Sequence, residues 1–208
     1  YLVAIAGNTT MQHLFMGLDP TGIGVAPFTP VTLETHTFDY NAPELKSIIK
    51  INSTGKIIVC ASIASYVGAD ILAGILATGI HMADKPCVLL DIGTNGEIVL
   101  GSKEKIYSCA TAAGPAFEGA NISCGVAGIQ GAINSVSYDN VKRFTTIGDK
   151  YPIGICGSGL IDAIFSMLKN GIIEESGYME SSEGFKITDN IILTQRDIRE
   201  VQNAKAAI

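Results

Sequence analysis

The sequence predicts an α/β fold built from mixed sheets flanked by helices. Three observations carry this prediction: short apolar runs with the length of buried strands, helix-like segments between them, and glycine-rich turns where several strands end. The 208 residues are 47% hydrophobic and 16% charged, which is typical of a chain with a sizeable core. This length allows one large domain or two small ones.

Charge and cysteine spacing exclude several functional classes. The net charge is −6 and no run of Lys and Arg exceeds two residues, so we expect no nucleic-acid-binding surface. The five cysteines have no Cys-x-x-Cys spacing and predict neither a disulfide framework nor a metal or iron–sulfur site. Free thiols in apolar contexts favour a reducing cytoplasm, and the N-terminal residues do not resemble a signal peptide. The cysteines are Cys60, Cys87, Cys109, Cys124 and Cys156.

The N-terminal segment predicts a strand followed by a capped helix. Leu2–Ala6 has the composition of a buried strand, and Thr9 or Thr10 is suited to cap the helix that follows. Asn8 and Thr9 would then lie at the carboxyl end of a parallel strand, where α/β sheets bind ligands, and are candidates for lining a cleft. We interpret His13 as a packing or surface histidine, because no partner for catalysis is near it in the sequence.

Further elements follow up to the middle of the chain. We expect a loop at Pro20–Pro30, an edge strand at Leu33–Tyr40, a short helix at Glu44–Ile51, a buried strand at Ile57–Cys60 and a helix of small residues at Tyr66–Ile80. The glycines of that last helix predict close packing against another backbone. The last two segments form an apolar region long enough for a membrane span. Its polar and glycine interruptions favour a buried strand and helix, and no membrane association is expected.

The stretch Cys87–Gly101, CVLLDIGTNGEIVLG, predicts two strands joined by a glycine-rich turn. The first strand ends on the carboxylate of Asp91, and Asn-Gly is a strong hairpin signal. Glycines let a backbone approach an anion closely, and a tight turn directs successive N–H groups into one concavity, so the turn is a candidate phosphate site. The turn residues are Gly93, Thr94, Asn95 and Gly96.

Asp91 stands where the strand meets this turn. One carboxylate suits a hydrated Mg²⁺ ion, which keeps several of its waters in protein sites. The same residues also fit an ordinary hairpin in which Asp91 caps its own turn, and the local pattern does not decide between the two interpretations.

The next elements are a strand at Ile106–Ala110 and a helix that begins at Gly114 and Pro115. A glycine at a helix N-terminus is a favourable phosphate neighbour. Glu118 falls in or near the first turn of that helix, where we favour a capping role over a catalytic one. Like Asn8 and Thr9, it is also a candidate for lining a cleft.

The C-terminal part predicts a hairpin of Gly131–Tyr138 and Val141–Ile147, followed by two helices. In the glycine-rich segment GICGSG, Ser158 is expected to be the N-cap of the first helix, which would end at Asn170-Gly171. The second helix opens with a capping box in TQRD. The faces predicted to be buried carry Leu160, Ile161, Ile164, Phe165 and Leu168 on the first helix, and Ile198, Val201 and Ile208 on the second.

Several motifs occur in the order found in reductive activators of corrinoid proteins: GNTTMQHLF, APFTPV, YVGADILAG, LLDIGTNGEIVLG, AAGPAFEGANI, GICGSGLIDAI and DIREVQNAKAAI. The chain resembles this family over nearly its whole length. These activators are ATP-dependent enzymes of the actin, sugar-kinase and heat-shock-chaperone (ASKHA) superfamily. Because the chain begins in a strand-like run and ends in a helix-like run, we expect it to be a fragment of such an activator.

The resemblance implies an ATPase of two ribonuclease-H-like lobes with nucleotide between them. Residues 1–64 would form a partial first lobe, residues 65–82 the connecting helix, and residues 86–208 a truncated second lobe. The turn after Asp91 would be the second phosphate loop, with Asp91 as the catalytic residue that holds Mg²⁺ through water. Gly114 and Pro115 would border the nucleotide. The first phosphate loop, the adenosine motif and a ferredoxin-like domain with a [2Fe–2S] cluster would lie outside these residues.

The activity implied by the resemblance is the reduction of Co(II) to Co(I) in a corrinoid methyl-carrier protein, driven by ATP binding or hydrolysis, for methyl transfer in one-carbon metabolism. The implied partner is that corrinoid protein, and a homodimer is a candidate assembly. Two alternatives stay open: a small-molecule kinase of the same superfamily, and a non-catalytic docking domain in which the hairpin is only structural.

Overall fold

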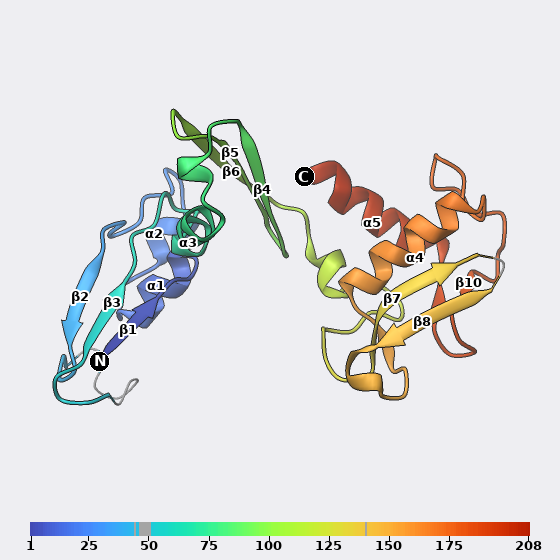
Figure 1. The fold of residues 1–208 in the computed structure, drawn as a ribbon, viewed down its shortest axis with the longest axis horizontal. Coiled ribbons are helices and arrows are strands. Elements are labelled where there is room, and N and C mark those ends of the chain that lie inside the picture. The colour runs from blue at the N-terminus through green and yellow to red at the C-terminus, as the bar shows by residue number, and fades with distance from the viewer. Residues whose placement is uncertain (44, 46–50, 140) are drawn as a thin grey trace. The chain divides into compact units, whose positions relative to one another are not determined.

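The computed structural model describes residues 1–43, 45, 51–139 and 141–208 (Figure 1). For Lys142 it describes the backbone but not the side chain. Its contacts divide the chain into two compact units. Unit 1 comprises Tyr1–Asp91 and Glu97–Ala110, and unit 2 comprises Ile92–Gly96 and Thr111–Ile208. The helix predicted at residues 44–51 lies almost entirely outside the described residues.

Unit 1 contains two three-stranded sheets and short helices. Its elements are β1 (Leu2–Ile5), α1 (Thr9–Phe15), α2 (Thr21–Gly24), β2 (His36–Asp39), β3 (Lys56–Val59), α3 (Ala69–Thr78), the 3₁₀ helix η1 (Ile80–Met82), β4 (Cys87–Ile92), β5 (Gly96–Gly101) and β6 (Ile106–Thr111), of which β4, β5 and β6 reach the boundary with unit 2.

The first sheet has the order β1-β3-β2, with β1 parallel and β2 antiparallel to β3. Ile57 pairs with Val3 on one side and Phe38 on the other, and Ile57 and Val59 are fully buried. The predicted buried strand at Ile57–Cys60 and the edge strand are therefore confirmed. The strand predicted at Leu2–Ala6 forms as β1, but it is not buried, because Leu2 is 64% exposed and its other residues are exposed or partly exposed. The loop predicted at Pro20–Pro30 contains one short helix, α2, which the proline and glycine content of that segment did not suggest.

The N-cap of α1 is Asn8, so the prediction of Thr9 or Thr10 is wrong by one or two residues. Asn8 has extended backbone angles, and its Oδ1 accepts a hydrogen bond from Met11 N at 2.8 Å. Thr9 is buried inside the helix, and its hydroxyl donates to the Ala64 carbonyl at 2.7 Å.

His13 is a packing residue, as predicted, but it does have polar partners. Its side chain is buried, Nδ1 lies 2.7 Å from Thr9 O, and Nε2 accepts a hydrogen bond from Val31 N at 3.0 Å. A carbonyl accepts and a backbone amide donates, so the imidazole is neutral with its proton on Nδ1. The partner amide comes from a loop 18 residues downstream, which local sequence inspection did not reveal.

Helix α3 is shorter than predicted, because Gly68 is its N-cap and Gly79, at φ +74°, ends it. A Cβ on Gly68 would lie 2.5 Å from Asn8 Cα, so the predicted close approach to another backbone holds at this glycine. At Gly74 the neighbour is instead a side chain, with Leu89 Cδ2 at 3.1 Å from the Cβ position.

The second sheet of unit 1 has the order β4-β5-β6 and packs one face against α3. The buried cluster between them consists of Val67, Ile71, Ile75 and Val99, with Leu89 partly buried against it. The predicted strands on both sides of the glycine-rich turn and the strand after them are confirmed, although β4 extends beyond Asp91 to Ile92.

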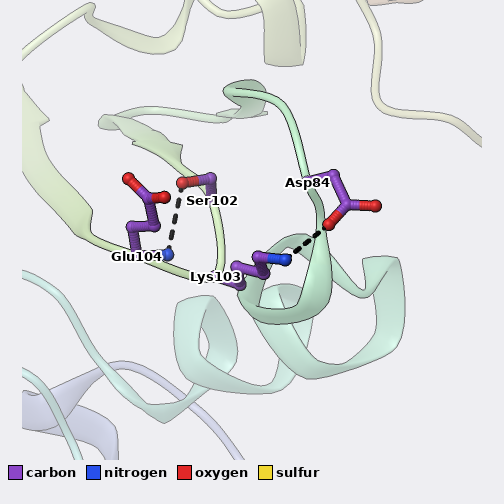
Figure 2. Close-up of polar contacts among 4 residues, drawn as sticks. All are labelled: Asp84, Ser102, Lys103 and Glu104. Carbon is purple, nitrogen blue, oxygen red and sulfur yellow. Dashed lines mark hydrogen bonds and ion pairs between the residues drawn. The ribbon is translucent and has the colours of Figure 1, made fainter.

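An exposed ion pair joins the segment before β4 to the turn between β5 and β6. Lys103 Nζ lies 2.7 Å from Asp84 Oδ1, and Ser102 Oγ accepts a hydrogen bond from Glu104 N at 3.3 Å; Figure 2 draws both interactions. The side chains of Lys103 and Asp84 are 57% and 84% exposed, so water competes with their attraction.

We expect Lys103→Ala to lower the free energy of unfolding by less than about 1 kcal/mol, because exposed ion pairs contribute little. Chemical denaturation of the variant and the parent measures this difference. A loss above about 2 kcal/mol would show that the pair contributes more than an exposed ion pair should.

Unit 2 is built on a sheet of order β8-β7-β9 that is covered by α4. Its elements are the 3₁₀ helix η2 (Pro115–Glu118), β7 (Ala132–Tyr138), β8 (Lys142–Thr146), η3 (Ile147–Asp149), β9 (Gly154–Ile155), α4 (Gly157–Lys169), β10 (Phe185–Lys186), β11 (Ile192–Leu193) and α5 (Gln195–Ala207). The predicted hairpin and both predicted helices are confirmed. No helix among the described residues of the chain is long and apolar enough to cross a membrane.

Two corrections concern α4. Its N-cap is Cys156, and the Ser158 hydroxyl instead donates to Asn134 O at 2.9 Å, so the predicted cap is wrong. The predicted apolar face is also wrong in part, because Phe165 is 65% exposed, and Ile161 and Leu168 are exposed as well. The buried face uses smaller or more flexible side chains, namely Leu160, Ala163, Ser166 and Met167.

Helix α5 begins with the predicted capping box of Thr194 and Asp197. Asp197 is buried and also accepts hydrogen bonds from Ser123 N at 2.7 Å and Ser123 Oγ at 2.6 Å. Burial acts to raise the pKa of Asp197, but the bonds from Ser123 and Thr194 outweigh it and hold the pKa below its usual range. The carboxylate therefore ties the loop at residue 123 to the start of α5.

Candidate functional site

The turn between β4 and β5 contains an internal backbone hydrogen bond. Gly93 N donates to Asn95 O at 3.0 Å, and the side chains of Thr94 and Asn95 are exposed. Within the part of the chain that the structure describes, the amides of Thr94 and Asn95 donate no hydrogen bond. Two consecutive free N–H groups at a glycine turn are the kind of donors that hold an anion.

The turn is joined within unit 2 to the segment that opens η2. Gly114 N donates to Thr94 O at 2.8 Å, and the Thr94 hydroxyl donates to Glu118 Oε2. Pro115 takes the first helical position, and Gly114 has φ +77° and ψ 164°, a conformation that favours glycine. The structure thus brings together predicted site residues that are about twenty positions apart in the sequence.

Gly96 has a different role from the other turn residues. It is buried at the start of β5, and a Cβ there would lie 3.0 Å from Thr111 Cγ2 and 3.2 Å from Ile208 Cγ1. Glycine at this position therefore permits close packing behind the turn.

Asp91 lies on β4 in unit 1, with an exposed side chain. No described residue donates a hydrogen bond to its carboxylate, so the structure does not show Asp91 capping its own turn. Burial, followed by the negative charges of Asp91 and Asp70, raises the pKa of Glu97. The carboxylates of Asp70, Asp91 and Glu97 therefore create a negative field within unit 1, which attracts cations.

These features suit the phosphates and hydrated Mg²⁺ of a nucleotide. The turn supplies hydrogen-bond donors, and a side chain on Gly93 would fill the space between Asn95 O and Glu118 Oε1, which lie 3.5 and 3.6 Å from the Cβ position. No group of three His, Cys, Asp or Glu residues in the described part of the chain is placed to hold a metal directly. A water-mediated Mg²⁺ needs only one or two protein carboxylates.

The other candidates from the sequence have local roles in unit 1. Asn8 Oδ1 caps α1, and Thr9 Oγ1 is bonded to Ala64 O, so both polar groups have partners. Their assignment to a cleft stays a prediction. Two residues that contribute to the negative charge near Asp91, Asp70 and Glu97, were not predicted from the sequence. Strand alternation could have indicated Glu97, because it places Glu97 on the same face of β5 as Val99, which packs against α3.

Comparison with known proteins identifies the family of this chain. Residues 85–208, more than half of the chain, match the family model described as the C-terminal domain of RACo, the ASKHA domain. The chain belongs to the RACo family. Residues 1–83 match the model of the RACo middle region. The ASKHA model therefore begins after residues 1–64, which were predicted to form a first ATPase lobe. The predicted lobe boundaries stay a prediction.

Three relatives agree with this family. The chain is 36% identical to the corrinoid activation enzyme RamQ of Eubacterium limosum, over 100% of the chain and 39% of RamQ. It is 32% identical to the [Co(II) methylated amine-specific corrinoid protein] reductase of Methanosarcina barkeri, over 76% of the chain and 34% of that protein. A solved reductive activator for corrinoid, iron-sulfur protein superposes with a TM-score of 0.83 at 39% identity, over 100% of the chain and 36% of that structure.

These relatives confirm the predicted family and the α/β fold of an ASKHA protein. The chain spans between a third and two fifths of the relatives' length. The activities in their names therefore belong to longer proteins.

Proposed function

We propose that the chain is the nucleotide-binding part of a reductive activator of a corrinoid protein. The observation that carries this proposal is the bonding of the β4–β5 turn to Gly114 and Glu118, inside the segment that matches the RACo ASKHA domain. It joins free amides, a glycine turn and the carboxylate of Glu118 in the segment that, by the resemblance to the superfamily, would hold phosphate.

In this proposal the turn Gly93–Gly96 holds nucleotide phosphates, with Gly114 and Pro115 beside them. Asp91 would be the catalytic carboxylate that holds Mg²⁺ through water, and the chemistry that the ion would supply is neutralisation of phosphate charge. ATP binding or hydrolysis then favours a closed arrangement of the ATPase. That arrangement would assist the one-electron reduction of Co(II) to Co(I) in the corrinoid partner, and the electron would be supplied by the [2Fe–2S] cluster expected elsewhere in the full activator.

Titration of Mg-ATP into the activator extended at both ends of this chain tests this proposal. We expect a measurable heat of binding and a rise in the unfolding temperature, since a ligand at one hundred times its Kd stabilises a protein by about 2.7 kcal/mol. Mg-free adenosine serves as the control, because it lacks phosphates. Absence of both heat and stabilisation would favour the docking domain, whereas phosphorylated products in a screen of sugars and carboxylates would favour a kinase.

A further inference from the structure

Glu118 places a negative charge at the turn where phosphate is proposed to bind. Its Oε2 accepts a hydrogen bond from the Thr94 hydroxyl, and its Oε1 lies 3.6 Å from the Cβ position of Gly93. Both carboxylate oxygens therefore face the turn. A site that only had to attract anions would not be expected to hold a carboxylate there.

A purely structural role in holding the turn does not explain why residue 118 is charged. The backbone of Thr94 is already held by the hydrogen bond from Gly114 N to Thr94 O at 2.8 Å. A glutamine would accept the Thr94 hydroxyl as a carboxylate does. What the carboxylate adds is repulsion toward other anions, which is much stronger beside a protein surface than in bulk water.

Nucleotide phosphates exist in two forms with different charge. Metal-free ATP carries several unneutralised negative oxygens, whereas Mg²⁺ bridges the β- and γ-phosphates and neutralises much of that charge. A fixed carboxylate at the turn penalises the first form much more than the second.

We propose that Glu118 makes the phosphate turn select Mg-ATP over metal-free ATP. The inference rests on the proposed function, since it requires that the turn binds nucleotide phosphate. Glu118 acts as a specificity-determining residue: it raises the free energy of the complex with bare phosphate and leaves the complex with cation-neutralised phosphate little changed.

The test is the affinity of ATP for the intact activator, the parent, and for its Glu118→Gln variant, measured by calorimetry in Mg²⁺ and again in EDTA. We expect Glu118→Gln to bind metal-free ATP at least tenfold more tightly than the parent and Mg-ATP within threefold of it. Glu175→Gln removes the same charge from an exposed position of unit 2 and should change neither affinity. Glu118→Ala, which also removes the charge, replaces Glu118→Gln if thermal unfolding shows that the glutamine variant does not fold.

The outcomes separate this inference from the proposed function. Unchanged metal-free affinity in the variant overturns the selective role, as does a loss of Mg-ATP affinity alone, which would instead identify Glu118 as a metal ligand. Failure of the parent to bind either form of ATP overturns the proposed function and this inference with it.

Discussion

Asp91→Asn is expected to lower Mg-ATP turnover by at least about a hundredfold while leaving the fold intact. The substitution keeps the shape of the side chain but removes the charge that would order hydrated Mg²⁺. Asp91 is exposed and receives no hydrogen bond from the described residues, so its charge contributes little to stability. The measurement is phosphate release by the intact activator, together with its unfolding temperature.

The matched control is Asp84→Asn. This residue is an exposed aspartate of the same unit that precedes β4, whereas the turn follows β4, and it is paired with Lys103 at 2.7 Å. It should keep the parent's turnover. Near-normal turnover in Asp91→Asn would remove Asp91 from the proposed catalytic role.

Asp197→Asn is expected to have the largest effect on stability, a loss of at least about 3 kcal/mol in the free energy of unfolding. The buried carboxylate accepts bonds from the amides and hydroxyls of both Ser123 and Thr194, at distances between 2.6 and 2.7 Å. An amide side chain has only one acceptor oxygen and places an NH₂ group against the remaining donors. Denaturant unfolding at neutral pH measures the loss, and Asp189→Asn, an exposed aspartate of the same unit, is the control.

The same carboxylate predicts a dependence of stability on pH. Because the folded pKa of Asp197 lies below its ordinary value, its contribution is complete above the unfolded pKa of about 3.9 and disappears as the pH falls through the lower folded pKa. Asp197→Asn should therefore lose less stability than the parent between neutral and acid pH. An equal acid dependence in both proteins would contradict this role.

A second readout comes from the neighbouring thiol. Burial and the charge of Asp197 raise the pKa of Cys124 to about 11, so this thiol should react slowly with alkylating reagents at neutral pH. Removing the charge in Asp197→Asn should lower the pKa of Cys124 and speed its alkylation in the folded state.

The sequence was informative where a signal was local and periodic. The buried strand β3, the Asn-Gly hairpin and the capping box at Thr194 each depend on a few adjacent residues, and each is confirmed. Helix α4 was harder because it carries two apolar faces. The larger side chains of Ile161 and Phe165 lie on the exposed face, and the close approach of Gly159 to Ile133 O, at 2.3 Å from the Cβ position, selects the other face for the core.

The candidate site shows the same limit. The turn residues were recognisable from their glycines, but the bond between Thr94 and Glu118 joins residues 24 positions apart. No periodicity links such a pair, because the path between them is set by β5, β6 and the positive φ of Gly114. The electrostatic coupling of Glu97 to Asp70 likewise depends on the packing of β5 against α3.

The division of the hairpin between units limits how this protein can be dissected. The backbone passes from one unit to the other at residues 91–92, 96–97 and 110–111, so no single truncation separates them. A shortened chain that starts at residue 85 would keep Leu89 and Val99 but lose Val67, Ile71 and Ile75, the apolar partners that cover them. Such a fragment would expose the apolar face of this sheet, so we expect it to aggregate more readily than the whole chain.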